Sequence, residues 1–314
     1  RQLLTTLAKE WSGQQSSQGL PLFEISAKQT GTGAGSGTTD RFTWIPNCNL
    51  REDLHEQLFR FIGQLLGCMI MSNVQCEILW AQPVWKWLVG DEINKEDLPS
   101  FNAGFKRAID FLENCDEDGW SGALALYSES FDHLHIGKEL RKRLRRRQVE
   151  SSDQPESLGM SLGMSLTESM TERITMSMPY AAKESVVRDA LELFTNFCKF
   201  QLDAISEGLY SVVPKDLLQM FDAEELETLL CGSSDVSVAH MRANMEVDMD
   251  VQEQANWVLE ILEAATPQFR SRFLGAMTGQ TRMMGRKWPF TLSFSSASSS
   301  EEHMIRFATC STTT

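Results

Sequence analysis

The sequence predicts a helix-rich α+β fold. Over most of the chain, apolar residues recur three and four positions apart, which is the spacing of a buried helix face. Strict alternation, the spacing of a strand, is found near the end, at Phe290, Leu292 and Phe294. The length of 314 residues and the hydrophobic fraction of 42 % are typical of a globular chain with about two domains.

The first forty residues combine three kinds of segment. Residues 1–20 are expected to be helical, and Pro21–Ile25 are expected to be extended. Residues 28–40 are rich in Gly, Thr and Ser, which predicts a flexible loop. This loop lacks the Gly-Lys-Ser/Thr ending of a phosphate-binding loop, so a nucleotide site is not expected there.

A wide apolar face predicts a long helix from about Leu58 to Ile70. Gly63 and Gly67 lie one turn apart on it. Because glycine disfavours a helix interior, the pair indicates close packing of another backbone rather than a ligand. Pro83 is placed to begin the next helix. Further helices are predicted at residues 101–114, 186–205, 216–221, 223–230, 257–262 and 269–277.

The middle of the chain is compositionally unusual. Residues 138–147 hold seven basic residues and one acidic residue, a net charge of 7 − 1 = +6. This run is a localisation signal or an anionic docking patch, or else a solvated charged surface. Residues 145–172 are Ser-rich and contain a short tandem repeat, so they are expected to form a mobile insertion.

Charge and hydropathy exclude two partner classes. The net charge of −14 makes general nucleic-acid binding a poor fit, because such proteins neutralise phosphates with basic residues. No apolar run approaches the ~20 residues that a membrane span requires, so no membrane partner is expected. An acidic body instead suits a basic protein partner or simply keeps the protein in solution.

The chain contains seven cysteines at irregular spacing, and none forms a C-x-x-C pair. A structural zinc site and a disulfide framework are therefore not expected. Reduced thiols indicate a cytoplasmic protein, with the nucleus as the alternative. Cys68 and Cys198 lie on apolar helix faces and are expected in the core, and Cys231, at a helix end, is expected to be structural.

Short motifs along the chain resemble, in order, the landmarks of one family. They are Leu58–Ile70, Pro83–Leu88, Phe200–Leu209, Glu225–Gly232, Asn256–Glu263, Arg272–Gly279 and Ala308–Cys310. Each motif alone is weak, but their common order is specific. On these motifs the chain resembles the HECT-type ubiquitin-protein ligase domain. The sequence of the motifs weakly favours the HERC-like branch of that family.

The resemblance implies a bilobal HECT fold. A helix-rich N-terminal lobe would cover residues 1–247, and a small α/β C-terminal lobe would cover residues 248–314. The second lobe is expected to be incomplete, because the chain stops four residues after Cys310, short of the family's last strand and tail. A hinge between the lobes is expected at residues 245–253.

The resemblance also implies the partners, which are a ubiquitin-conjugating enzyme, ubiquitin and protein substrates. No cofactor and no metal are implied. The smaller subdomain of the N-terminal lobe would dock the conjugating enzyme. The matching positions are Leu202, Ile205, Leu209 and Tyr210, whose apolar side chains could anchor an interface. Burial of these side chains within the helix packing is the alternative.

By the same resemblance, Cys310 would carry ubiquitin as a thioester before transfer to a substrate lysine. Covalent catalysis of this kind divides one difficult transfer into two easier ones. A free thiol is only partly ionised at neutral pH, so nearby positive charge would help. His303 and Arg306 could supply that charge, and Thr309 could hold the loop by a hydrogen bond. Ordinary exposed or strand residues are the alternative for all three.

The catalytic segment departs from the family pattern. Met304-Ile305 replace the usual Leu-Pro before the cysteine, and Ser311 replaces the usual Phe after it. These departures favour a second hypothesis, a degenerate HECT-like module that only binds a conjugating enzyme or substrate. A third hypothesis is an unrelated helical scaffold that matches the motifs by chance.

Overall fold

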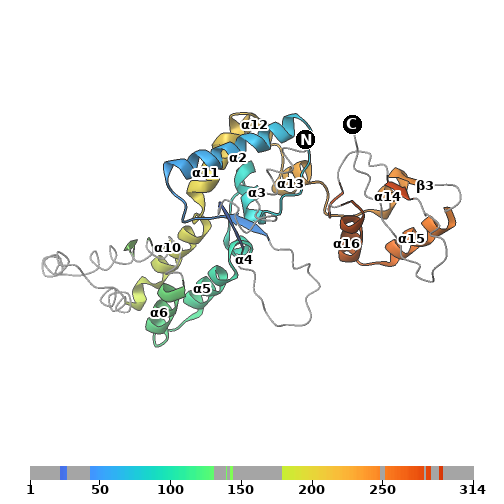
Figure 1. Cartoon of the computed structure of the whole chain (residues 1–314). Helices are drawn as coiled ribbons and strands as arrows, with labels where there is room; N and C mark the ends of the chain where they lie inside the picture. Colours follow the sequence, from blue (N-terminus) through green and yellow to red (C-terminus); the bar gives the residue numbers. More distant parts are fainter. Residues whose placement is uncertain are drawn as a thin grey trace.

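The computed structural model describes residues 22–26, 43–130, 139, 142–143, 179–247, 252–278, 281–283 and 290–292. Two separate clusters of buried apolar side chains divide these residues into two lobes (Figure 1). We call residues 22–231 the large lobe and residues 236–292 the small lobe. The fold is helix-rich with short strands, so the predicted α+β class is confirmed.

The large lobe consists mainly of helices. Its elements are β1 (Phe23–Ile25), β2 (Trp44–Pro46), α2 (Asp53–Met71), α3 (Gln82–Val89), η1 (Lys95–Asp97), α4 (Leu98–Phe101), α5 (Ala103–Asn114), α6 (Trp120–Ser130), η2 (Tyr180–Ala182), α10 (Lys183–Thr195), α11 (Lys199–Tyr210), α12 (Lys215–Leu218) and α13 (Ala223–Cys231). Strands β1 and β2 pair antiparallel, with Glu24 opposite Ile45. The extended segment and most of the helices predicted here are confirmed.

Capping residues explain where several helices begin and end. Asn102 Oδ1 accepts a hydrogen bond from the Gly104 N–H at 2.8 Å, which starts α5. Asp222 and Glu225 form a capping box at the start of α13. Pro83 lies at the first turn of α3, as predicted, and Gly90, at φ +88°, ends that helix in a left-handed conformation.

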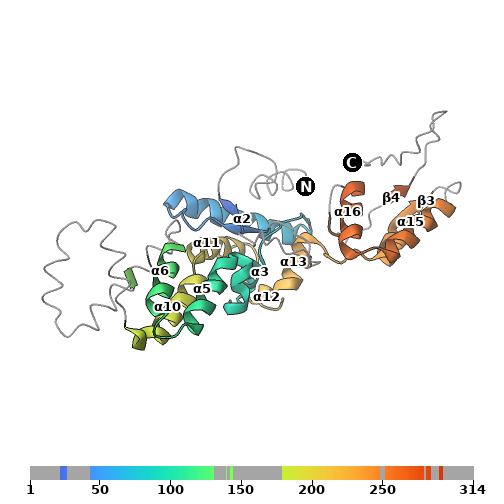
Figure 2. The ribbon, with the colours of Figure 1, turned by 90° about the horizontal axis from the view of Figure 1, so that it is seen from below.

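Helices α2 and α11 pack with their backbones in contact. A Cβ atom added at Gly63 would collide with the Ile205 carbonyl oxygen, and one at Gly208 would collide with the Arg60 carbonyl oxygen. The backbone contact predicted for Gly63 is therefore confirmed. Gly67 instead faces the Val212 side chain. Figures 1 and 2 both show α2 and α11 side by side.

The single long helix predicted over residues 186–205 is wrong. The chain forms α10 and α11, separated by a turn at residues 196–198. Apolar residues on both sides of the turn enter one core, so the helical spacing continues through the break. Phe197 in the turn contacts Phe101 edge-on, with ring centroids 4.8 Å apart. Asn196 ends α10 and is itself a helix stop signal, but the apolar spacing that continues past it outweighed this signal in the prediction.

The small lobe begins earlier than predicted. Its elements are α14 (Val238–Asn244), β3 (Met245–Val247), α15 (Gln252–Ala264), α16 (Pro267–Thr278) and β4 (Phe290–Leu292). Its core already includes Val236, whereas Cys231 belongs to the large core. Strand β3 pairs in parallel with β4. The lobes therefore divide between residues 231 and 236. The boundary expected at 247 and the described part of the hinge expected at residues 245–253 fall inside the small lobe.

Some predicted segments lie outside the described residues, namely the helix at 1–20, the loop at 28–40 and the insertion at 145–172. Of the basic run, only Glu139, Lys142 and Arg143 are described, and Arg143 Nη2 lies 3.2 Å from Glu192 Oε1. Across the described part of the chain, no helix has both the length and the apolar character of a membrane span.

Candidate functional site

The predicted catalytic segment lies outside the described residues. This applies to Cys310 and to its expected supporting residues Thr309, His303 and Arg306. Their roles stay predictions. The described residues bear on the site in other ways: through the rival cysteines, the expected docking residues, a surface hollow and the junction between the lobes.

Four of the described cysteines are buried, namely Cys48, Cys76, Cys198 and Cys231. Removal from water raises the pKa of the Cys198 thiol well above its usual value. Burial likewise raises the pKa of the Cys231 thiol, although the nearby Arg282 opposes the shift. A buried thiol with a raised pKa is a poor nucleophile. The core position predicted for Cys198 is confirmed.

Cys68 does not lie in the core as predicted. Its side chain is exposed on the outer face of α2. The apolar face of α2 is wider than the surface that α11 covers. Phe61 and Met71 are therefore exposed as well, by 48 % and 69 %. Cys115, at the end of α5, is half-buried. Among the described cysteines, Cys68 is therefore the accessible rival to Cys310.

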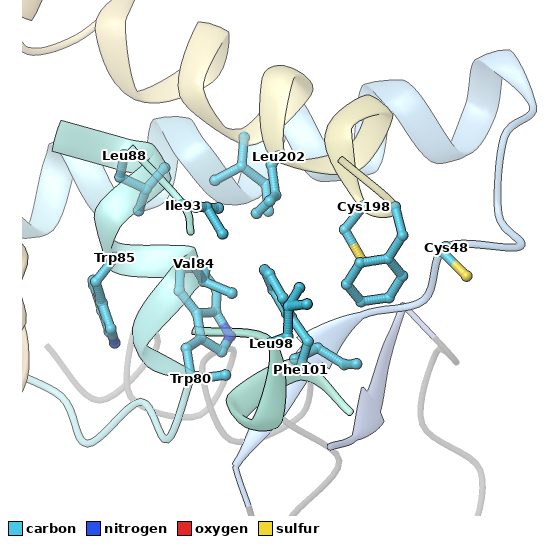
Figure 3. Packing of buried hydrophobic residues seen from close by; sticks show 14 of the residues in the cluster. Cys48, Trp80, Val84, Trp85, Leu88, Ile93, Leu98, Phe101, Cys198 and Leu202 are labelled. Atoms are coloured by element: carbon cyan, nitrogen blue, oxygen red, sulfur yellow. The ribbon is translucent and has the colours of Figure 1, made fainter. Parts of the chain in front are cut away.

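Three of the four expected docking residues are buried. Leu202, Ile205 and Leu209 are 1 %, 0 % and 0 % exposed. Figure 3 shows Leu202 pointing from α11 into the same packing as Ile93 and Leu98. Side chains without exposed surface cannot contact a partner, so the docking role expected for them is corrected. They hold α11 in the core of the large lobe.

Tyr210 is half-buried and has structural partners. Its hydroxyl donates a hydrogen bond to the Leu88 carbonyl oxygen at 2.9 Å, and Lys215 Nζ lies 5.6 Å from the ring centroid. Burial raises the pKa of the phenol, and the nearby Asp203 adds to this shift. These contacts join α11 to α3 and α12, so Tyr210 also has a structural role.

An open hollow of about 720 Å³ lies on the subdomain formed by α5, α6 and α10. Its lining includes the apolar side chains of Val187 and Leu191 from α10 and the charged side chains of Lys183, Arg188 and Glu113. Sequence patterns could not predict this hollow, because its residues come from α5 and from a segment that begins nearly seventy residues later. The core beneath it is aromatic: Phe105 stacks on Phe194 with ring centroids 4.3 Å apart.

The junction between the lobes contains a glycine in an unusual conformation. Gly232 ends α13 with φ +81° and ψ 166°, a region that other residues rarely adopt. Residues 281–283 return from α16 to the same place, where Met283 pairs with Ser233. Both ribbon views show the chain passing from α13 across this junction to the small lobe (Figures 1 and 2).

Comparison with known proteins gives consistent matches. A sequence model of the family described as HECT-domain (ubiquitin-transferase) matches residues 14–312. The E3 ubiquitin-protein ligase HERC2 of Mus musculus is 26 % identical over 81 % of this chain and 5 % of HERC2. The E3 ubiquitin-protein ligase HACE1 of Danio rerio is 25 % identical over 78 % of this chain and 25 % of HACE1.

The E3 ubiquitin-protein ligase NEDD4 of Homo sapiens is 22 % identical over 83 % of this chain and 17 % of NEDD4. The chain thus spans a quarter or less of the length of these relatives. The matched region nevertheless covers nearly all of the chain and includes the position of Cys310.

Proposed function

The chain belongs to the HECT-domain (ubiquitin-transferase) family, and on that basis we propose that it accepts ubiquitin as a thioester on Cys310 and passes it to lysines of protein substrates. The observation that carries the proposal is the family match over residues 14–312, a range that includes the cysteine proposed as the nucleophile. The burial of Cys48, Cys76, Cys198 and Cys231 supports the choice of nucleophile, because it leaves few accessible rivals.

The proposed reaction has two balanced steps. In the first, the Cys310 thiolate attacks the carbonyl carbon of the thioester between ubiquitin and the conjugating enzyme. A new carbon–sulfur bond forms, the old one breaks, and the thiolate of the conjugating enzyme leaves. In the second, a neutral lysine amine attacks the thioester on Cys310. An amide bond forms, the Cys310 thiolate leaves, and the nitrogen releases a proton to water. Neither step changes an oxidation state.

We place the docking site of the conjugating enzyme on the hollow of the α5–α6–α10 subdomain. This hollow combines apolar Val187 and Leu191 with charged side chains, the mixture found at protein interfaces that have an apolar centre and a polar rim. Arg188 lines the hollow and is exposed. Reversing its charge should slow loading of Cys310 without unfolding the lobe, since rim charges chiefly affect the rate of association.

The test is a thioester assay with ubiquitin, activating enzyme and a panel of conjugating enzymes, separated on a non-reducing gel. We expect an adduct that disappears with reducing agent, persists in Cys68→Ala and is absent from Cys310→Ala. Arg188→Glu should load more slowly than Arg107→Glu, the same substitution at an exposed position of α5 that does not line the hollow. Equal rates for the two would contradict the docking site.

The degenerate binding module remains the second candidate, favoured by Met304, Ile305 and Ser311 beside Cys310. The same experiment separates the two. If a folded chain binds a conjugating enzyme but no member of the panel forms an adduct, the transferase proposal fails and the binding module stands. If the adduct forms on Cys310, the binding-only hypothesis fails.

A further inference from the structure

Among the described residues, two segments of the chain join the lobes at the same place. The first is the covalent crossing at residues 232–235, between the two cores. The second is the returning segment, residues 281–283. The Ser233 N–H donates to the Met283 carbonyl oxygen at 2.8 Å, and the Met283 N–H donates to the Ser233 carbonyl oxygen at 2.9 Å. The returning segment therefore pairs with the crossing itself.

Glu77 of the large lobe contacts the returning segment. Its Oε2 accepts a hydrogen bond from the Thr281 N–H at 3.2 Å, and its Oε1 accepts another from the Thr281 hydroxyl. Glu77 stands between Cys76 and Ile78, whose side chains are 1 % and 3 % exposed. Glu77 itself is half-buried, and the burial of the residues on either side fixes the segment from which its carboxylate reaches Thr281.

Arg282 makes the second contact with the large lobe. Its Nη2 lies 2.5 Å from Glu227 Oε1 of α13, and its Nη1 donates to the Gly232 carbonyl oxygen at 3.3 Å. The Arg282 and Glu227 side chains are only 10 % and 13 % exposed. An ion pair with so little access to water is weakly screened by salt, and removal of one partner leaves the other charge poorly solvated.

The returning segment is equally fixed to the small lobe. The Ser271 hydroxyl, on α16, donates to the Thr281 carbonyl oxygen at 2.7 Å, and Ser271 is 4 % exposed. Met283 is 9 % exposed and belongs to the small core. Each end of the contact is thus anchored in a packed core, so a change in the contact must change how the two cores are oriented.

We propose that Glu77, Glu227, Thr281 and Arg282 form a polar clasp that holds the small lobe in one orientation on the large lobe, and that opening the clasp lets the small lobe turn about Gly232. Its role in catalysis rests on the proposed function: the clasp would control which way the lobe that carries Cys310 faces. Arg282 and Glu227 are accordingly positioning residues rather than catalytic ones.

Hydrogen exchange on the whole chain tests the clasp. In Arg282→Met and in Glu227→Gln, we expect the amides of Ser233 and Met283 to exchange at least about tenfold faster, because opening no longer breaks the ion pair. Amides of α2, deep in the large lobe, should keep their protection. Arg270→Met is the matched control, since Arg270 Nη1 bonds the Val236 carbonyl oxygen at 3.2 Å within the small lobe.

If Ser233 and Met283 exchange no faster in Arg282→Met and Glu227→Gln than in Arg270→Met, the clasp is overturned. Faster exchange throughout α2 would also overturn it, because the pair would then support the whole fold. The thioester assay on the same variants separates the two proposals. A changed rate of transfer from Cys310 to lysine supports the catalytic role. Absence of an adduct in the unsubstituted chain would defeat the proposed function but leave the exchange result intact.

Discussion

The large lobe and the small lobe differ in whether aromatic side chains enter their buried cores. In the large lobe, rings pack face to face and edge to face around Phe105, which is 0 % exposed. In the small lobe, Trp257 and Ile261 lie one turn apart on α15 and remain 53 % and 62 % exposed. The small core is made of aliphatic residues and Met: Val236, Val238, Met241, Leu259, Leu262, Leu274 and Met283.

This difference indicates two kinds of stability. Hydrophobic stabilisation scales with the apolar area removed from water, so the large lobe derives most of its stability from its own interior. The small lobe removes less apolar area from water, so the polar contacts at the junction contribute a larger share of its stability. We expect the small lobe to open locally at a lower free energy than the large lobe. Three substitutions test this contrast, from the largest expected effect to the smallest.

Gly208→Ala should destabilise the large lobe by about 3 kcal/mol or more, because the added methyl collides with the Arg60 carbonyl oxygen and separates α2 from α11. Gly122→Ala on α6 is the matched control, since a Cβ there meets no atom within 4 Å. The control should gain up to about 1 kcal/mol from helix propensity. Urea titration measures both, and equal effects of the same sign would contradict the backbone contact.

Leu259→Ala should lower the stability of the small lobe by about 2–3 kcal/mol, because Leu259 is 3 % exposed within the small core. Hydrogen exchange should then rise over α15 and α16 while α2 keeps its protection. Leu226→Ala is the same change in the large core. It should instead raise hydrogen exchange over α2 and α11. If Leu259→Ala raised exchange equally in both lobes, the chain would unfold as one unit.

Lys95→Gln should cost the large lobe only a few tenths of a kcal/mol, because exposed ion pairs contribute little. Lys95 contacts Asp110 and Glu113, and its hydrogen bond holds the pKa of Asp110 below the usual value. A carboxyl whose pKa is lowered on folding contributes stability at neutral pH and loses it as the pH falls through the folded-state pKa.

The gap between the thermal midpoints of Lys95→Gln and the unsubstituted chain should therefore shrink between pH 7 and pH 3. The pKa of Lys95 is raised by its hydrogen bonds to Asp110 and Glu113. Its contribution to the free energy of unfolding would therefore persist at neutral pH and be lost only at high pH. In an Asp110→Asn background the gap should be smaller and less dependent on pH. A gap that widened in acid would contradict the stabilising effect at neutral pH that the lowered pKa of Asp110 implies.

Much of the fold could be predicted from local patterns. Pro83 and the apolar face around Ile62 specified helices α3 and α2, because capping and periodicity are properties of neighbouring residues. The family was recognisable because several short motifs occur in a fixed order. Local patterns could not show which apolar face finds a partner. Leu202 and Cys68 both lie on apolar helix faces, yet Leu202 is buried and Cys68 is exposed.

Contacts between distant segments were the other part that sequence reasoning missed. Glu77 and Thr281 are 204 positions apart, and no periodicity links them. The one local signal was a carboxylate set between apolar Cys76 and Ile78. Similarly, α14 is too short for its apolar spacing to predict which of the two cores it joins. Tertiary packing determines both the contact between Glu77 and Thr281 and the lobe to which α14 belongs.

The position of Gly232 gives the small lobe the geometry of a lever. Helix α15 has 13 residues and is therefore about 20 Å long. If the lobe turned by about 15° at Gly232, a rotation of the size seen in known subunit movements, a point 20 Å from this pivot would travel about 5 Å. The clasp lies beside the pivot, where the same rotation moves atoms least. Small changes at residues 281–283 would thus be amplified into large displacements at the far end of the lobe.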